Sequence, residues 1–321
     1  MIADLDVVAE DLVKSGVRKS TARAYSSAQA QFLSFCQSLR LCPIPTSERT
    51  ILTFMAYMYK KGLSHASMNV YLSGIRNLNV INGYDIPQVR SPKVKLALKA
   101  VLERSAEPLK KSPITWELLQ KMWPVVESSK DTHLWQAVLS LAFFGGMRCA
   151  EYAPSTASEV CPRIKDVTFT DSGKVMKYKV HKSKTRTHGF VCQLACSENK
   201  ICATCCMLNY ISIRSKMYRI SKSSYLFVNS QGQQLCSAHV NKFIKSTIKA
   251  LGLNEKCYSA HSIRSGAAST AALSGFSEWE IKKLGGWKTS IYSEYIRNVQ
   301  SHTLQFSKRL ARANNTDGLT S

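Results

Sequence analysis

The spacing of apolar residues changes along the chain, and this change constrains the fold more than any other feature. In segments between residues 20 and 144, and again after residue 202, apolar residues recur every three or four positions, as in amphipathic helices. Between these regions, residues 164–170, 175–180 and 190–194 favour strands, with a turn at 171–173. The chain is therefore predicted to be mainly α with one small antiparallel β-sheet.

The first hundred residues predict a helical domain. Expected helices cover residues 20–39, 51–59, 67–80 and about 93–104, and Ser20 or Thr21 is a plausible N-cap of the first. Residues 104–115 then combine prolines with adjacent charges, which is typical of a solvated linker. We expect a first domain over 1–108 and a second over 113–321, where helices at 116–126 and 134–144 precede the strands.

Net charge indicates the class of partner. The 321 residues hold 44 Lys and Arg against 21 Asp and Glu, a formal charge of +23. Both predicted domains share the excess of basic residues. Residues 1–112 hold 16 basic and 8 acidic residues, and residues 113–321 hold 28 basic and 13 acidic residues. This balance predicts a polyanionic partner, either nucleic acid or an acidic membrane surface. An apolar content of 45% excludes a wholly disordered basic protein.

Membrane and export signals are not expected. The longest nearly apolar run, residues 137–147, is too short to span a bilayer, and the mildly acidic residues 1–6 fit neither a secretory signal nor a transit peptide. The cysteine count is eleven, an odd number, so we expect reduced thiols in the cytosol or nucleus rather than a disulfide framework.

Two segments of the second domain carry cations suited to phosphate. Arg148 follows two glycines at the start of a helix, and Glu151, one turn later, is placed to hold its guanidinium. Taken alone, the pair also fits an ordinary surface ion pair. The basic turn at 182–189 includes Lys182 and Lys184. An alternative interpretation of this turn is a charged sheet edge that prevents aggregation.

Two further segments follow near the C-terminus. His261 and Arg264 are three residues apart on one predicted helix, with small residues after them that suit close packing on a neighbouring helix. A histidine here is also a common helix cap or core residue. Trp287 can pack its ring and still offer an indole N–H, and it is followed by Tyr292 and Tyr295. An alternative interpretation of these three residues is an aromatic helix packed on the core.

Taken in chain order, these residues form an arrangement that resembles the tyrosine recombinase family over nearly the whole chain. Residues 261–268, 285–290 and 295–297 are similar in style to the Crypton, DIRS and Ngaro recombinases of eukaryotic mobile elements. The resemblance implies a helical core-binding, DNA-binding domain followed by an α+β catalytic domain. It assigns as catalytic residues Arg148, Lys184, His261, Arg264, Trp287 and Tyr295. Lys182 and Tyr292 remain rivals of Lys184 and Tyr295.

The reaction implied by the resemblance is site-specific cutting and rejoining of double-stranded DNA. Tyr295 would form a 3′-phosphotyrosine, the two arginines would neutralise the phosphate, and Lys184 would protonate the leaving 5′ oxygen, with neither metal nor ATP as cofactor. The family also implies a homotetramer on two DNA sites, and the eukaryotic relatives imply the nucleus. Two alternatives are a catalytically silent DNA-binding protein and a type IB topoisomerase-like enzyme.

A cysteine cluster admits a separate interpretation. Cys202 and Cys205 have the spacing of half a zinc knuckle, and Cys192 with Cys196 would form the second half, with Cys206 and His188 nearby. Buried thiols on a strand are common, however, and we favour that interpretation and predict no metal site.

Overall fold

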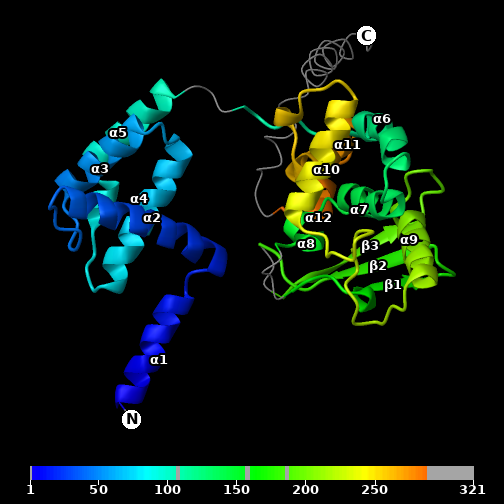
Figure 1. The fold of residues 1–321 in the computed structure, drawn as a ribbon, viewed down its shortest axis with the longest axis horizontal. Coiled ribbons are helices and arrows are strands. Elements are labelled where there is room, and N and C mark those ends of the chain that lie inside the picture. The colour runs from blue at the N-terminus through cyan, green and yellow to red at the C-terminus, as the bar shows by residue number, and fades with distance from the viewer. Residues whose placement is uncertain (1, 106–108, 156–159, 185–187, 288–321) are drawn as a thin grey trace, which may run out of the picture. The chain divides into compact units, whose positions relative to one another are not determined.

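The structure is a computed structural model that describes residues 2–105, 109–155, 160–184 and 188–287. The chain divides into two compact units, Met1–Pro108 and Leu109–Ser321, and each has its own hydrophobic core (Figure 1). The division falls inside the proline-containing segment that the sequence marks as a linker. In the described part of the chain, no helix is both long and apolar enough to cross a membrane.

The first unit is entirely helical in its described residues. Its elements are α1 (Ile2–Ser15), α2 (Lys19–Ser38), α3 (Glu48–Lys60), α4 (His65–Ile81), the 3-10 helix η1 (Pro87–Arg90) and α5 (Pro92–Arg104). Helices α2 and α4 approach closely where a Cβ on Gly74 would lie 3.1 Å from the Cβ of Ala28. Phe32 of α2 and Phe54 of α3 pack edge to face in the core, with ring centroids 5.2 Å apart.

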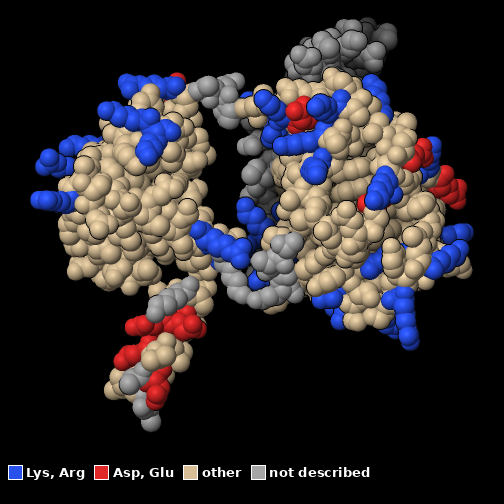
Figure 2. Space-filling view, viewed as in Figure 1, with Lys and Arg blue, Asp and Glu red and all other residues tan. Residues whose placement is uncertain are grey.

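Two predictions for this unit need correction. Helix α2 begins at Lys19 with Arg18 as its N-cap, so neither Ser20 nor Thr21 caps it. The sequence interpretation also missed α1, although Ile2, Leu5 and Leu12 have helical spacing. These apolar side chains are exposed. Figure 2 shows a group of acidic residues on α1, whereas most of the charged residues elsewhere in this view are Lys or Arg.

The second unit contains the sheet. Strands β1 (Val167–Thr170), β2 (Val175–Val180) and β3 (Phe190–Ala195) pair antiparallel in the order β1-β2-β3, with Tyr178 opposite both Val167 and Cys192. The predicted strand at 164–170 is three residues too long, because residues 164–166 form the 3-10 helix η2. The carboxylate of Asp166 accepts the backbone N–H of Arg163 at 2.8 Å and closes that turn.

Helices lie beside this sheet and complete the second core (Figure 1). They are α6 (Trp116–Glu127), α7 (Thr132–Phe144), α8 (Cys149–Tyr152), α9 (Ala203–Met217), α10 (Ser237–Ala250), the 3-10 helix η3 (Glu255–Cys257), α11 (Ala260–Leu273) and α12 (Glu278–Gly285). Helix α11 is buried along most of its length. Its small residues allow this, since a Cβ on Gly266 would lie 1.7 Å from the carbonyl oxygen of Ile114. The prediction of a mainly α fold with one small antiparallel sheet is confirmed.

Candidate active site

Arg148 is held in place by its own helix turn. It is the N-cap of α8, and its backbone N–H donates to Glu151 Oε2 at 2.8 Å while its Nη1 donates to Oε1 at 3.1 Å. The side chain of Glu151 is only 3% exposed and that of Arg148 22%. The pair is therefore partly buried and rigid, unlike the solvent-exposed ion pair that the alternative interpretation describes.

The β2–β3 turn reaches Arg148. Ser183 is buried, and its Oγ lies 3.5 Å from Arg148 Nη1. The lysines on either side of it, Lys182 and Lys184, are exposed. A second bond ties the sheet to α8, because the hydroxyl of Tyr178 donates to the carbonyl of Glu151 at 2.8 Å.

Arg264 joins three distant segments of the chain. It is 1% exposed, and its Nη1 donates to the carbonyl of Gly146 while its Nη2 donates to the carbonyl of Gly285 at 2.8 Å. Its Cζ lies 4.1 Å from the ring centroid of Trp287. One guanidinium thus connects α11 to the loop before Arg148 and to the end of α12.

Two glycines make this junction possible. Gly146 has a φ of 53°, and a Cβ there would lie 3.3 Å from Leu284 Cγ and 3.4 Å from Gly285 Cα. A Cβ on Gly285 would lie only 1.9 Å from the ring of Trp287. The indole can therefore cover Arg264 only because residue 285 has no side chain, and Trp287 is 7% exposed as a result.

His261 lies one turn before Arg264 in the first turn of α11. Its side chain is solvent-exposed, although protein atoms displace part of its hydration. This desolvation lowers the pKa of His261, and the positive charges of Arg264, Arg148 and Lys184 lower it further. Three cations from separate segments therefore act on one imidazole, which places the four groups in one electrostatic environment.

The described residues bring together five of the six predicted catalytic positions. Arg148, His261, Arg264 and Trp287 converge on one region, and Lys184 acts on His261 through its charge. Tyr295 and its rival Tyr292 lie outside the described residues, as does the tip of the turn at 185–187. The sequence interpretation missed Ser183. Its position between two lysines, in a segment where buried and exposed residues alternate, could have indicated that its side chain points inward.

The cysteine cluster differs from the zinc knuckle considered, and not favoured, from the sequence spacing. Cys196, Cys202 and Cys205 lie together, whereas Cys192 and Cys206 pack against the hydrophobic core and His188 is not among the group. The eleven cysteines all lie in the described residues, and no disulfide joins any two of them. Burial raises the pKa of the Cys202 thiol, but hydrogen bonds from Cys205 and Ser197 outweigh it and lower that pKa to about 7.

Two known proteins are similar to this chain over most of its length. The chain is 23% identical over 335 residues to the recombinase Cre of Escherichia phage P1, covering 94% of each protein. It is 22% identical over 278 residues to the XerD integrase/recombinase homologue of Selenomonas ruminantium, covering 84% of this chain and 78% of that protein.

Solved structures show the same fold. The Tn1549 transposon integrase in complex with transposon right end DNA has a TM-score of 0.63 at 14% identity, covering 94% of this chain and 98% of that one. A lambda integrase dimer bound to a COC′ core site has a TM-score of 0.58 at 16% identity, covering 92% and 95%. The profile of the phage integrase family matches residues 115–302, more than half of the chain. The protein is therefore a member of the phage integrase family, whose members are the tyrosine recombinases.

Proposed function

We propose that this protein is a site-specific DNA recombinase that cuts and rejoins double-stranded DNA through a 3′-phosphotyrosine intermediate. The observation that carries the proposal is the set of contacts made by Arg264, which lies one helical turn after His261. These contacts link the loop before Arg148 to Gly285 and Trp287. Residues far apart in the sequence thereby form one cationic site of the kind that phosphoryl transfer requires.

The arginines neutralise the charge of the reacting phosphate. A phosphodiester repels nucleophiles, and its transition state spreads negative charge over the non-bridging oxygens. Arg148, with its fork held by Glu151, binds these oxygens. Arg264 adds its charge beneath them and fixes the loop from which Arg148 projects. His261 and the indole N–H of Trp287 supply further hydrogen bonds to the phosphate.

Tyr295 is the nucleophile and Lys184 the general acid. The phenol of Tyr295 gives its proton to water, and the nearby cations stabilise the phenolate. The phenolate oxygen then attacks phosphorus. The bond from phosphorus to the 5′ oxygen breaks, and Lys184 protonates that oxygen. The phosphotyrosine conserves the energy of the broken bond, so a 5′-hydroxyl can reverse the reaction and rejoin the strand without ATP.

The substrate and setting extend this proposal. Basic residues in both units bind the DNA duplex, and four copies assemble on two DNA sites. Support for a mobile-element substrate comes from the resemblance to Crypton, DIRS and Ngaro recombinases and from the fold shared with a transposon integrase. A eukaryotic element of this kind would act in the nucleus.

The test is formation of a covalent protein–DNA adduct. The protein is incubated in EDTA with nicked duplex carrying the flanking ends of its own genetic element, with the label 5′ of the cut on the scissile strand. A denaturing gel should show labelled DNA attached to the wild type and to Tyr292→Phe, but not to Tyr295→Phe.

Other results would select another function. Tight, salt-sensitive DNA binding without an adduct would favour a catalytically silent DNA-binding protein. Relaxation of supercoiled DNA without sequence preference would favour a type IB topoisomerase-like enzyme. An adduct lost only in Tyr292→Phe would make Tyr292 the nucleophile in place of Tyr295.

A further inference from the structure

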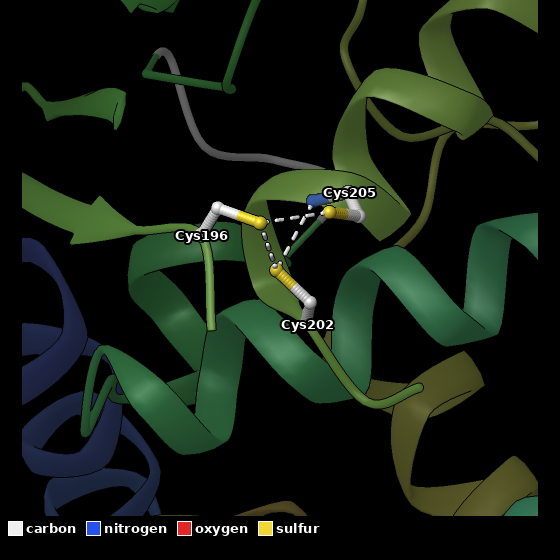
Figure 3. Close-up of side chains that lie close together, drawn as sticks. All are labelled: Cys196, Cys202 and Cys205. Carbon is white, nitrogen blue, oxygen red and sulfur yellow. Dashed lines mark hydrogen bonds between the residues drawn. The ribbon is translucent and has the colours of Figure 1, made fainter. Parts of the chain in front are cut away.

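Three cysteine sulfurs meet where β3 ends and α9 begins. Cys196 directly follows β3, Cys202 is the N-cap of α9, and Cys205 lies in its first turn. The Sγ of Cys196 is 3.2 Å from that of Cys205 and 3.7 Å from that of Cys202. All three sulfurs lie within 4.8 Å of one another, and Figure 3 shows them pointing toward a common centre.

These distances match ligands of one metal ion. A tetrahedral Zn²⁺ binds sulfur at about 2.3 Å, which places two sulfur ligands about 3.8 Å apart. A disulfide would require about 2.0 Å between sulfurs, well below either spacing. We propose that Cys196, Cys202 and Cys205 bind a single Zn²⁺ ion, with a water molecule as its fourth ligand.

The backbone around Cys202 is arranged to stabilise a thiolate, the form of cysteine that binds metal. The amide N–H groups of Ser197 and Cys205 both donate to Cys202 Sγ, each at 3.4 Å. Cys202 also caps the N-terminus of α9, where the helix dipole favours negative charge. Thiolate is a soft ligand that selects zinc over the hard cations Mg²⁺ and Ca²⁺.

The exposure of the three residues indicates how the coordination is completed. Cys202 is buried and Cys196 half-buried, whereas Cys205 is exposed, so solvent reaches one side of the cluster. Zinc sites with three protein ligands keep their fourth position for water. The ion would join the end of β3 to the start of α9, and the opposite end of β3 leads to the turn that carries Lys184. No step of the proposed DNA chemistry uses this ion.

The first test measures zinc in the full chain. Protein purified with a phosphine reductant and dialysed against metal-free buffer is analysed by mass spectrometry for metals. We expect one zinc per chain in the wild type and in Cys42→Ser, which removes an exposed cysteine of the first unit. Cys196→Ser and Cys205→Ser should each lower zinc affinity at least about tenfold, measured by competition with a chromophoric chelator.

Cys202→Ser separates metal binding from folding. Serine is a preferred N-cap, so this variant should keep α9 and its circular dichroism spectrum while it loses the zinc. In Co²⁺-loaded protein, tetrahedral coordination gives visible d–d bands and sulfur-to-metal charge transfer, and both should weaken in all three serine variants.

Three results would overturn the proposal. The first is wild-type protein that holds less than about one tenth of an equivalent of zinc and develops no Co²⁺ bands. The second is equal loss of zinc in Cys42→Ser. The third is a disulfide within the cluster, found by peptide mapping of protein that was alkylated at lysis and never exposed to a reductant.

Discussion

The guanidinium of Arg264 lies over the indole of Trp287, with its Cζ 4.1 Å from the ring centroid. The two residues are nearly buried, and the contact exists because Gly285 leaves room for the ring. An arginine buried in this way loses its hydration, so the ring and the carbonyls of Gly146 and Gly285 must stabilise it. Trp287 therefore has a structural as well as a chemical role in the proposed site.

Substitutions of Trp287 should separate these two roles. Trp287→Ala removes the ring above Arg264 and leaves a cavity, so the free energy of unfolding should fall by about 3–5 kcal/mol. Trp287→Phe keeps an aromatic face but has no N–H, so stability should fall by only about 1 kcal/mol while strand cleavage slows about tenfold. Chemical denaturation and single-turnover cleavage measure the two effects. Equal loss of stability in both variants would contradict the claim that an aromatic face over Arg264 stabilises the fold.

Glu151 is a positioning residue for Arg148. Glu151→Gln keeps an acceptor but removes the buried charge, so cleavage should slow about 10- to 100-fold and stability should fall by about 1–3 kcal/mol. DNA affinity, set mainly by the wider basic surface, should stay near that of the wild type. Glu127→Gln breaks the exposed ion pair with Lys200 and serves as the control, with a change below about 0.5 kcal/mol. Unchanged cleavage by Glu151→Gln would remove Glu151 from the site.

The role of Lys184 can be tested with a better leaving group. Lys184→Ala should slow cleavage of ordinary DNA about 10²- to 10⁴-fold, because the 5′ oxygen leaves without a proton donor. DNA with sulfur in place of that bridging oxygen needs no such donor, so cleavage by the variant should return to within about threefold of the wild-type rate. Lys182→Ala is the matched control. If the sulfur-containing DNA instead restored cleavage by Lys182→Ala and not by Lys184→Ala, Lys182 would be the general acid in place of Lys184.

His261 should make stability depend on pH. Desolvation and the charges of Arg264, Arg148 and Lys184 lower its pKa in the folded protein below the ordinary value of 6.5. As pH falls through 6.5 toward the folded pKa, the unfolded chain takes up a proton that the folded protein does not, so stability falls. His261→Gln should reduce this loss between pH 7 and pH 5. An NMR titration midpoint of His261 above 6.5 in the free protein would contradict the arrangement of cations.

The pKa of His261 in the DNA complex provides a second check on its surroundings. A DNA phosphate bound by Arg148 contributes negative charge beside the imidazole, so the pKa of His261 should rise when DNA binds. The same NMR resonance follows this change. A midpoint that does not move would mean that the phosphate lies elsewhere.

Local patterns in the sequence predicted much of the fold and part of the site. Strand 175–180 is predicted by the two-residue repeat of a β-strand. The Arg148–Glu151 pair is predicted by the three-residue spacing of side chains that are neighbours on a helix. The contact of Arg264 with Gly146 spans 118 residues and depends on tertiary packing, so no spacing reveals it. Cys192 lies within β3 and packs against the core, whereas Cys196 follows the end of the strand, beside the start of α9. The choice of Cys196 as the neighbour of Cys202 therefore depends on where β3 ends, which its spacing from Cys192 does not reveal.

The central claim is that Tyr295 carries the DNA during the reaction. The most direct measurement isolates the covalent adduct, digests it with nuclease and protease, and locates the attached nucleotide by mass spectrometry. We predict a nucleotide linked through its 3′-phosphate to Tyr295. A nucleotide on Tyr292 or any other residue, or a linkage through a 5′-phosphate, would contradict the proposed mechanism.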